Sequence, residues 1–125
     1  MPSAPIRVLI ADDHRLFAEA LDAILGTDDR LLIVAHASDG EEAVQLAGEL
    51  QPDVVLMDID MPVLDGIEAT RAIRAGGAGS SILILTASSS RADVERAREA
   101  GAAGYVTKDR VAAELIAAIV EIAAP

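Results

Sequence analysis

Five short apolar runs alternate with amphipathic segments along the 125-residue chain. Each run has the length of a strand, and each intervening segment has apolar residues at helical spacing. Five strand–helix units in succession predict an α/β fold, in which a doubly wound parallel sheet carries helices on both faces. The expected strands are Ile6–Ala11, Leu31–Ala37, Asp53–Asp58, Ile82–Ala87 and Gly104–Lys108.

The expected helices have recognisable start signals. Three of them begin at a capping residue that stands three positions before an acid, a pattern that satisfies free backbone N–H groups. These pairs are Asp39 and Glu42, Asp65 and Glu68, and Ser90 and Asp93. Asp109 is a candidate cap for the last helix. The first helix should bury the stripe Leu16, Phe17, Ala20, Leu21, Ile24 and Leu25. The expected helices are Arg15–Leu25, Gly40–Leu50, Gly66–Ala75, Arg91–Gly101 and Ala112–Ala123.

Composition excludes several kinds of function. The chain has no cysteine, which excludes disulfides and thiolate metal sites. Its formal net charge of -11 repels phosphate backbones, so we expect this segment to bind no nucleic acid. It shows no signal-peptide pattern, and its apolar runs are too short to cross a bilayer. We therefore expect one cytoplasmic domain over residues 1–125, without membrane contact.

Acidic residues stand where two of the expected strands end. Asp12 and Asp13 follow the first strand, and Asp58 closes the third, whose apolar residues suit burial on both faces. A flavodoxin-like strand order, 2-1-3-4-5, would make these strands neighbours at the switch point where such sheets bind ligands. Converging carboxylates require a divalent cation, and Mg²⁺ prefers oxygen ligands. The sequence therefore predicts a Mg²⁺ site at this edge.

The other strand ends supply further parts of a phosphoryl-transfer site. Thr86 closes the fourth strand with a hydroxyl donor. Lys108 closes the fifth strand and is the only lysine in the chain, so it can balance the acids. Near a metal ion, Asp58 can act as a nucleophile toward phosphorus.

Each of these residues also has an ordinary structural interpretation. Acids after strands often cap helices, Thr86 suits a strand, and a lone Lys108 is usually solvated. Tyr105 is by default a half-buried packing residue. His14 and His36 look isolated, and we assign neither to a metal or to catalysis. The joint occurrence of acids, threonine and lysine at successive strand ends is not explained by these interpretations.

The motifs together resemble the receiver domain of bacterial two-component response regulators. They are Asp12-Asp13, Asp58 with Met61-Pro62 and Asp65-Gly66, Thr86-Ala87, and Lys108 within Gly-Tyr-Val-Thr-Lys-Asp. The resemblance covers essentially the whole chain. The segments Ala11-Asp-Asp-His-Arg-Leu-Phe17 and Gly104-Tyr-Val-Thr-Lys-Asp109 are most similar to the NarL/LuxR-type subfamily, whose members usually carry a C-terminal helix-turn-helix domain. Such an output domain is expected outside this chain.

The resemblance implies roles for the acids. Asp58 would accept a phosphoryl group from a sensor histidine kinase, with no enzymatic activity beyond self-phosphorylation and autodephosphorylation. Asp13 and Asp58 would hold Mg²⁺, with Asp12 binding through water or as a second ligand. The backbone carbonyl of Asp60 would complete the set. The Asp60 and Ser88 side chains lie where they would tune the lifetime of the phosphoryl group.

The resemblance also implies a switch. Lys108 would pair with Asp58 and then with the phosphoryl group. Thr86 would move toward a phosphoryl oxygen, and Tyr105 would rotate inward behind it. Phosphorylation would thereby bias a two-state element.

Alternatives stay open at this point. The chain would also suit a free-standing receiver, or a phosphorylation-independent receiver that acts as a docking or dimerisation module. Asp58-Ile-Asp60 resembles the motif of Mg²⁺-dependent phosphatases of the haloacid dehalogenase class, although that class places its nucleophile on an early strand. The last helix is broadly apolar, which favours either a homodimer patch or a helix buried by the sheet. Its apolar residues are Val111, Leu115, Ile116, Ile119, Val120 and Ile122.

Overall fold

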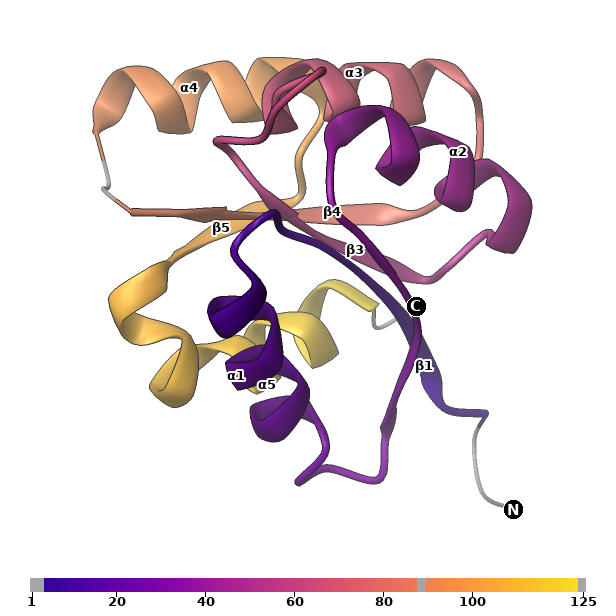
Figure 1. Ribbon diagram of the computed structural model, residues 1–125, viewed down its shortest axis with the longest axis vertical. Helices are drawn as coiled ribbons and strands as arrows, with labels where there is room; N and C mark the ends of the chain where they lie inside the picture. Colours follow the sequence, from indigo (N-terminus) through magenta and orange to yellow (C-terminus); the bar gives the residue numbers. More distant parts are fainter. Residues whose placement is uncertain (1–3, 88–89, 124–125) are drawn as a thin grey trace.

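Five parallel strands form one sheet in the order β2-β1-β3-β4-β5 (Figure 1). The computed structural model describes residues 4–87 and 90–123. The predicted flavodoxin-like order is confirmed, and it places the first and third strands side by side. The strands are β1 Ile6–Ala11, β2 Leu31–Ala37, β3 Val54–Asp58, β4 Ser81–Thr86 and β5 Gly104–Thr107.

The helices cover both faces of this sheet, as predicted. Helices α2, α3 and α4 lie on one face, above the sheet in Figure 1, and α1 and α5 lie on the other. A 3-10 turn, η1 (Lys108–Arg110), leads into the last helix. The helices are α1 Arg15–Leu25, α2 Gly40–Leu50, α3 Gly66–Ala75, α4 Arg91–Ala100 and α5 Val111–Ala123.

Three helix starts are capped as predicted. The backbone N–H of Glu42 donates to Asp39 at 2.8 Å, and that of Glu68 donates to Asp65 at 2.8 Å. The N–H of Asp93 donates to the Ser90 hydroxyl oxygen at 3.2 Å. Each bond satisfies one of the N–H groups that a helix start leaves free.

The predicted cap of the last helix is wrong. Asp109 lies inside η1, and Lys108, which was expected to end β5, opens that turn. The chain therefore enters α5 from a 3-10 turn rather than from an extended capping residue.

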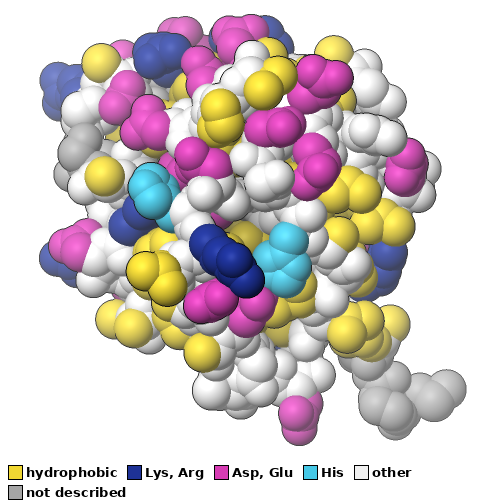
Figure 2. All heavy atoms as spheres, viewed as in Figure 1, with side chains coloured by type: hydrophobic (Ala, Val, Ile, Leu, Met, Phe, Trp, Pro, Cys, Tyr) yellow, Lys and Arg dark blue, Asp and Glu magenta, His cyan; other side chains and the backbone are white. Residues whose placement is uncertain are grey.

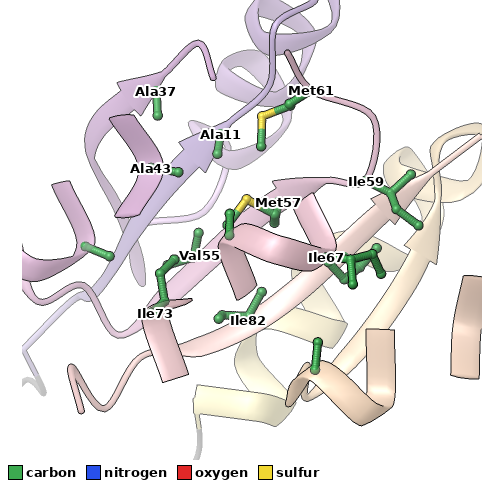
Figure 3. Packing of buried hydrophobic residues seen from close by; sticks show 14 of the residues in the cluster. Ala11, Ala37, Ala43, Val55, Met57, Ile59, Met61, Ile67, Ile73 and Ile82 are labelled. Carbon is green, nitrogen blue, oxygen red and sulfur yellow. The ribbon is translucent and has the colours of Figure 1, made fainter. Parts of the chain in front are cut away.

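Each face of the sheet has its own apolar core because side chains alternate along a strand. In β3, Val55 and Met57 pack with residues of α2, α3 and α4, as Figure 3 shows. Val54 and Leu56 face the opposite way and pack with α1 and α5. All five residues of β3 are buried, which makes it the central strand that its composition predicted.

Burial in α1 departs from the predicted stripe. Leu21 and Leu25 are buried, but Leu16 is 82% exposed. Leu16 precedes Leu21 by five positions, which turns it by about 140° around the helix and away from the sheet.

Helix α5 is mainly a helix buried by the sheet. Val111, Leu115 and Ile119 are buried, and the other large apolar side chains of the helix are partly buried. The exposed large apolar residues in the described ranges lie elsewhere; they are Leu16, Leu32, Val63 and Tyr105. Within the described residues, α5 therefore contributes no exposed large apolar side chain.

Gly66, the first residue of α3, packs directly on the backbone at the end of β3. Its N–H donates to the carbonyl of Ile59 at 3.0 Å. A Cβ at this position would overlap the backbone oxygen of Asp58 and lie 2.9 Å from the Cα of Ile59. Because Gly66 has no side chain, the start of α3 can pack closely against the backbone of Asp58.

We predict that Gly66→Ala lowers the free energy of unfolding by about 1–3 kcal/mol, because the added carbon meets rigid backbone. Urea denaturation followed by circular dichroism measures this change. Gly48→Ala is the matched control, since Gly48 lies within α2 and an added Cβ there meets nothing within 4 Å. That variant should gain about 0.5–1 kcal/mol from helix propensity. Equal stability of the Gly66→Ala variant and the parent protein would contradict the packing described.

Candidate functional site

The carboxyl ends of β1 and β3 bring the acids together. Ala11 and Met57 are partners in the β1–β3 register, so Asp12 and Asp58, one position further along, stand side by side. Asp58 is only 2% exposed, and Asp12 is 5% exposed. Asp13 points toward solvent, with its side chain 34% exposed. The structure therefore confirms that the ends of β1 and β3 lie side by side, as the sequence predicted.

Asp12 and Asp58 are held in the same way. Oδ1 of Asp12 accepts the backbone N–H of His14 at 2.7 Å, and Oδ1 of Asp58 accepts that of Asp60 at 3.2 Å. Within the described residues, Oδ2 of each carboxylate is buried and has no hydrogen-bond partner. Buried polar atoms are rarely left in this state unless a ligand or a charge takes them up.

Lys108 supplies the positive charge closest to these oxygens. Its Nζ lies 3.3 Å from Oδ2 of Asp58 and 3.5 Å from Oδ2 of Asp12. The ring of Phe17, from the first turn of α1, lies 4.6 Å from the same nitrogen. An aromatic face attracts a cation and limits its access to water. One lysine is thus held between two carboxylates and a ring.

Burial raises the pKa of Asp58 to about 6, and the negative charge of Asp12 adds to the rise. Lys108 and the N–H of Asp60 act in the opposite direction. Above about pH 6, Asp58 is therefore a buried carboxylate whose negative charge is only partly offset by its surroundings.

The acids form a ligand set for a divalent cation. One ligand atom from each of Asp12, Asp13, His14 and Asp58 lies within 4.8 Å of the others. The Oδ2 atoms, which lack a hydrogen bond and share one lysine, and the excess of carboxylate oxygens fit a hard cation. Figure 2 shows acidic and histidine side chains sharing one face of the molecule.

The remaining predicted residues surround this cluster. Thr86 is buried at the end of β4, and its neighbour Leu85 pairs with Asp58 in the β3–β4 register. Tyr105 is 44% exposed and lines a surface groove of about 780 Å³ between β5 and α5. Asp60 is exposed. The predicted effect of Ser88 lies outside the described residues.

Sequence reasoning missed two contributors. His14 was read as isolated, yet its Nδ1 lies 3.6 Å from Oδ1 of Asp13. Its place directly after Asp12-Asp13 was the available signal. Phe17 was assigned to the buried stripe of α1, whereas its ring also covers Lys108. No pattern along the chain links Phe17 to Lys108.

The family model described as the response regulator receiver domain matches residues 8–120. The chain belongs to this family. It is 43% identical over 114 residues to the transcriptional regulatory protein LiaR of Bacillus subtilis, covering 91% of this chain and 54% of that protein. The chain spans about half the length of the curated relatives it matches. Receiver domains of this kind are signalling switches of two-component systems and, in general, not enzymes.

Solved structures agree with this assignment. The signal receiver domain of NarL from Mycobacterium tuberculosis is 33% identical, with a TM-score of 0.93 over 97% of this chain and 98% of that one. A LuxR-family response regulator from Aurantimonas sp. is 40% identical, with a TM-score of 0.91 over 96% and 86% of the two chains. The resemblance to the NarL/LuxR-type subfamily is therefore confirmed. In the described ranges, no helix has the length and apolar character needed to span a membrane.

The raised pKa of Asp58 predicts a dependence of stability on pH. The neutral form of Asp58 is favoured in the folded state, so its stabilising contribution is complete below the ordinary pKa of 3.8 and is lost as pH rises through about 6. Relative to Asp58→Asn, the protein in EDTA should lose up to about 3 kcal/mol between about pH 4 and about pH 7. Urea denaturation across this range measures the difference.

Two variants control this prediction because they should move the pKa of Asp58 in opposite directions. Asp12→Asn removes a neighbouring negative charge and should lower it, whereas Lys108→Met removes the offsetting cation and should raise it. Carboxyl ¹³C NMR titration reports both values. Shifts of the same sign in the two variants, or an ordinary pKa for Asp58 in the parent protein, would contradict the electrostatic account.

Proposed function

We propose that Asp58 is the phosphoacceptor of this receiver domain and takes its phosphoryl group from a phosphohistidine on a sensor histidine kinase. The observation that carries this proposal is the buried Oδ2 of Asp58, which has no hydrogen-bond partner and faces Lys108 at 3.3 Å. An ionised, poorly solvated carboxylate oxygen beside a single ammonium group is suited to nucleophilic attack.

The chemistry follows from the surroundings of this oxygen. Asp58 is ionised above about pH 6, and its Oδ2 attacks the phosphorus atom. A P–O bond forms and the P–N bond to the imidazole breaks, with the electron pair returning to the nitrogen. Lys108, already within ion-pair distance, then faces the added negative charge.

Mg²⁺ is the proposed cofactor. Asp13, Asp58 and the backbone carbonyl of Asp60 would hold the ion, with Asp12 binding through water or as a second ligand. The bound ion would offset carboxylate charge and polarise phosphoryl oxygens. A structural neighbour from Borrelia burgdorferi, 26% identical with a TM-score of 0.89, is a CheX–CheY complex with BeF₃ and Mg²⁺, which supports a combined metal and phosphoryl site.

The proposed output begins at Thr86 and Tyr105. The Thr86 hydroxyl would donate to a phosphoryl oxygen, and Tyr105 would turn from its exposed position toward the space behind Thr86. Thr86 and Thr107 are register partners, so β4 carries such a movement directly to β5. The surface around β5 and α4 would thereby change shape.

Besides the kinase, we propose an output domain as a partner, joined to the receiver domain in a longer protein. The relatives include transcriptional regulators about twice as long as this chain, which supports an output domain that binds DNA. The formal net charge of -11 favours placing DNA contact outside this segment. The family match argues against the phosphatase alternative, although Asp58-Ile-Asp60 shares its motif.

Incubation with acetyl phosphate and Mg²⁺ tests the phosphoacceptor assignment. Intact mass spectrometry should show one added phosphoryl group on the parent protein. The adduct should be absent in EDTA and in Asp58→Asn, because the first lacks the metal and the second lacks the nucleophile. Asp60→Asn is the matched control, since it changes the next acid along the chain and should retain the adduct.

Absence of an adduct has to be separated from rapid hydrolysis. Beryllofluoride binding, followed by ¹⁹F NMR, reports the same site without turnover. A folded protein that neither gains the adduct nor binds beryllofluoride would contradict the proposal and favour the phosphorylation-independent docking module.

A further inference from the structure

The imidazole of His14 stands at the mouth of the acidic site. Its Nδ1 lies 3.6 Å from Oδ1 of Asp13 and 3.9 Å from Oδ1 of Asp12. The backbone N–H of His14 donates to Asp12 at 2.7 Å, which anchors the residue beside that carboxylate. The ring itself is 72% exposed and therefore has room to turn.

These distances are close to those that one metal ion imposes on its ligands. Ligand atoms at about 2.1 Å from a tetrahedral ion lie roughly 3.4 Å apart. A small rotation of the exposed ring brings Nδ1 to that separation from the Asp13 oxygen. The site also contains buried Oδ2 atoms on Asp12 and Asp58 that have no hydrogen-bond partner among the described residues. They share the single ammonium group of Lys108, which leaves a surplus of negative charge that a dication would offset.

A nitrogen ligand changes which ions a site prefers. Carboxylate and carbonyl oxygens suit Mg²⁺, whereas imidazole suits Zn²⁺, Ni²⁺ and Cu²⁺. His36, the only other histidine, is 2.7 Å from Asp22 in a separate pair and does not belong to this cluster. The chain has no cysteine, so within the described residues His14 is the side chain that brings a ligand other than oxygen to this site.

We propose that His14 joins Asp12, Asp13 and Asp58 as a nitrogen ligand, so that the site binds Zn²⁺-class dications in competition with Mg²⁺. This inference rests on the proposed function only in requiring the acidic site to hold a divalent cation. It assigns His14 a role in metal selectivity, through coordination of the same ion rather than through contact with the phosphoryl group.

Isothermal titration calorimetry of the untagged protein with Zn²⁺ and, separately, Mg²⁺ tests this role. His14→Gln should weaken Zn²⁺ binding by at least about tenfold, since even changes to groups behind a ligand cost that much. Mg²⁺ affinity should stay within about twofold, because the oxygen ligands are unchanged. His36→Gln is the matched control and should retain both affinities. Imidazole ¹⁵N NMR should show a Zn²⁺-dependent shift of the His14 ring alone.

The outcomes separate this inference from the proposed function. Equal Zn²⁺ affinity in His14→Gln and the parent protein, or an equal loss in His36→Gln, would overturn the role of His14 while leaving Mg²⁺ binding intact. Zn²⁺ binding at several weak sites without an effect of His14→Gln would also overturn it. Failure of both ions to bind would count against the proposed metal-dependent function as well.

Discussion

The buried carboxylates of Asp12 and Asp58 share the ammonium group of Lys108. The strand register and the packing of the helices hold these three residues together. Lys108 Nζ lies within 3.5 Å of Oδ2 atoms on both Asp12 and Asp58. Two negative charges beside one positive charge leave an imbalance that burial makes costly. The pKa of Asp58, raised to about 6, is a direct consequence. A site in this condition is stabilised by whatever brings positive charge to it, and this is the physical basis for the proposed metal ion. The proposed phosphoryl group adds negative charge, so it would depend on that ion and on Lys108.

The fold holds the two buried acids in place, whereas Tyr105 on β5 is exposed. The β1–β3 register sets the two acids side by side, and the close packing of Gly66 fixes α3 over the end of β3. Apolar cores on both faces hold the strands that carry these ends. Tyr105, by contrast, is exposed on β5, close in the sheet to the end of β4. The proposed switch would therefore reach the surface through the ends of β4 and β5.

Much of this organisation could be predicted from the sequence because strand ends in a parallel sheet converge by geometry. Apolar runs marked the strands to within a residue or two, and Asp39, Asp65 and Ser90 marked helix starts. The structure brings Asp12, Asp13, Asp58 and Lys108 together, while their chemical roles stay predictions. Leu16 and Asp109 were misplaced because their environments depend on the rotation of α1 and on the turn before α5. The contacts of His14 and Phe17 depend on side-chain directions, which no periodicity encodes.

The intrinsic fluorescence of Tyr105 tests most directly whether events at Asp58 reach the surface. It is the only tyrosine, and the chain has no tryptophan, so the signal comes from one residue. Beryllofluoride with Mg²⁺ should change the emission intensity and reduce quenching by acrylamide, because the proposed rotation takes Tyr105 away from solvent. Asp58→Asn should show neither change. Unaltered emission and quenching in the parent protein, with beryllofluoride binding verified by ¹⁹F NMR, would contradict the account.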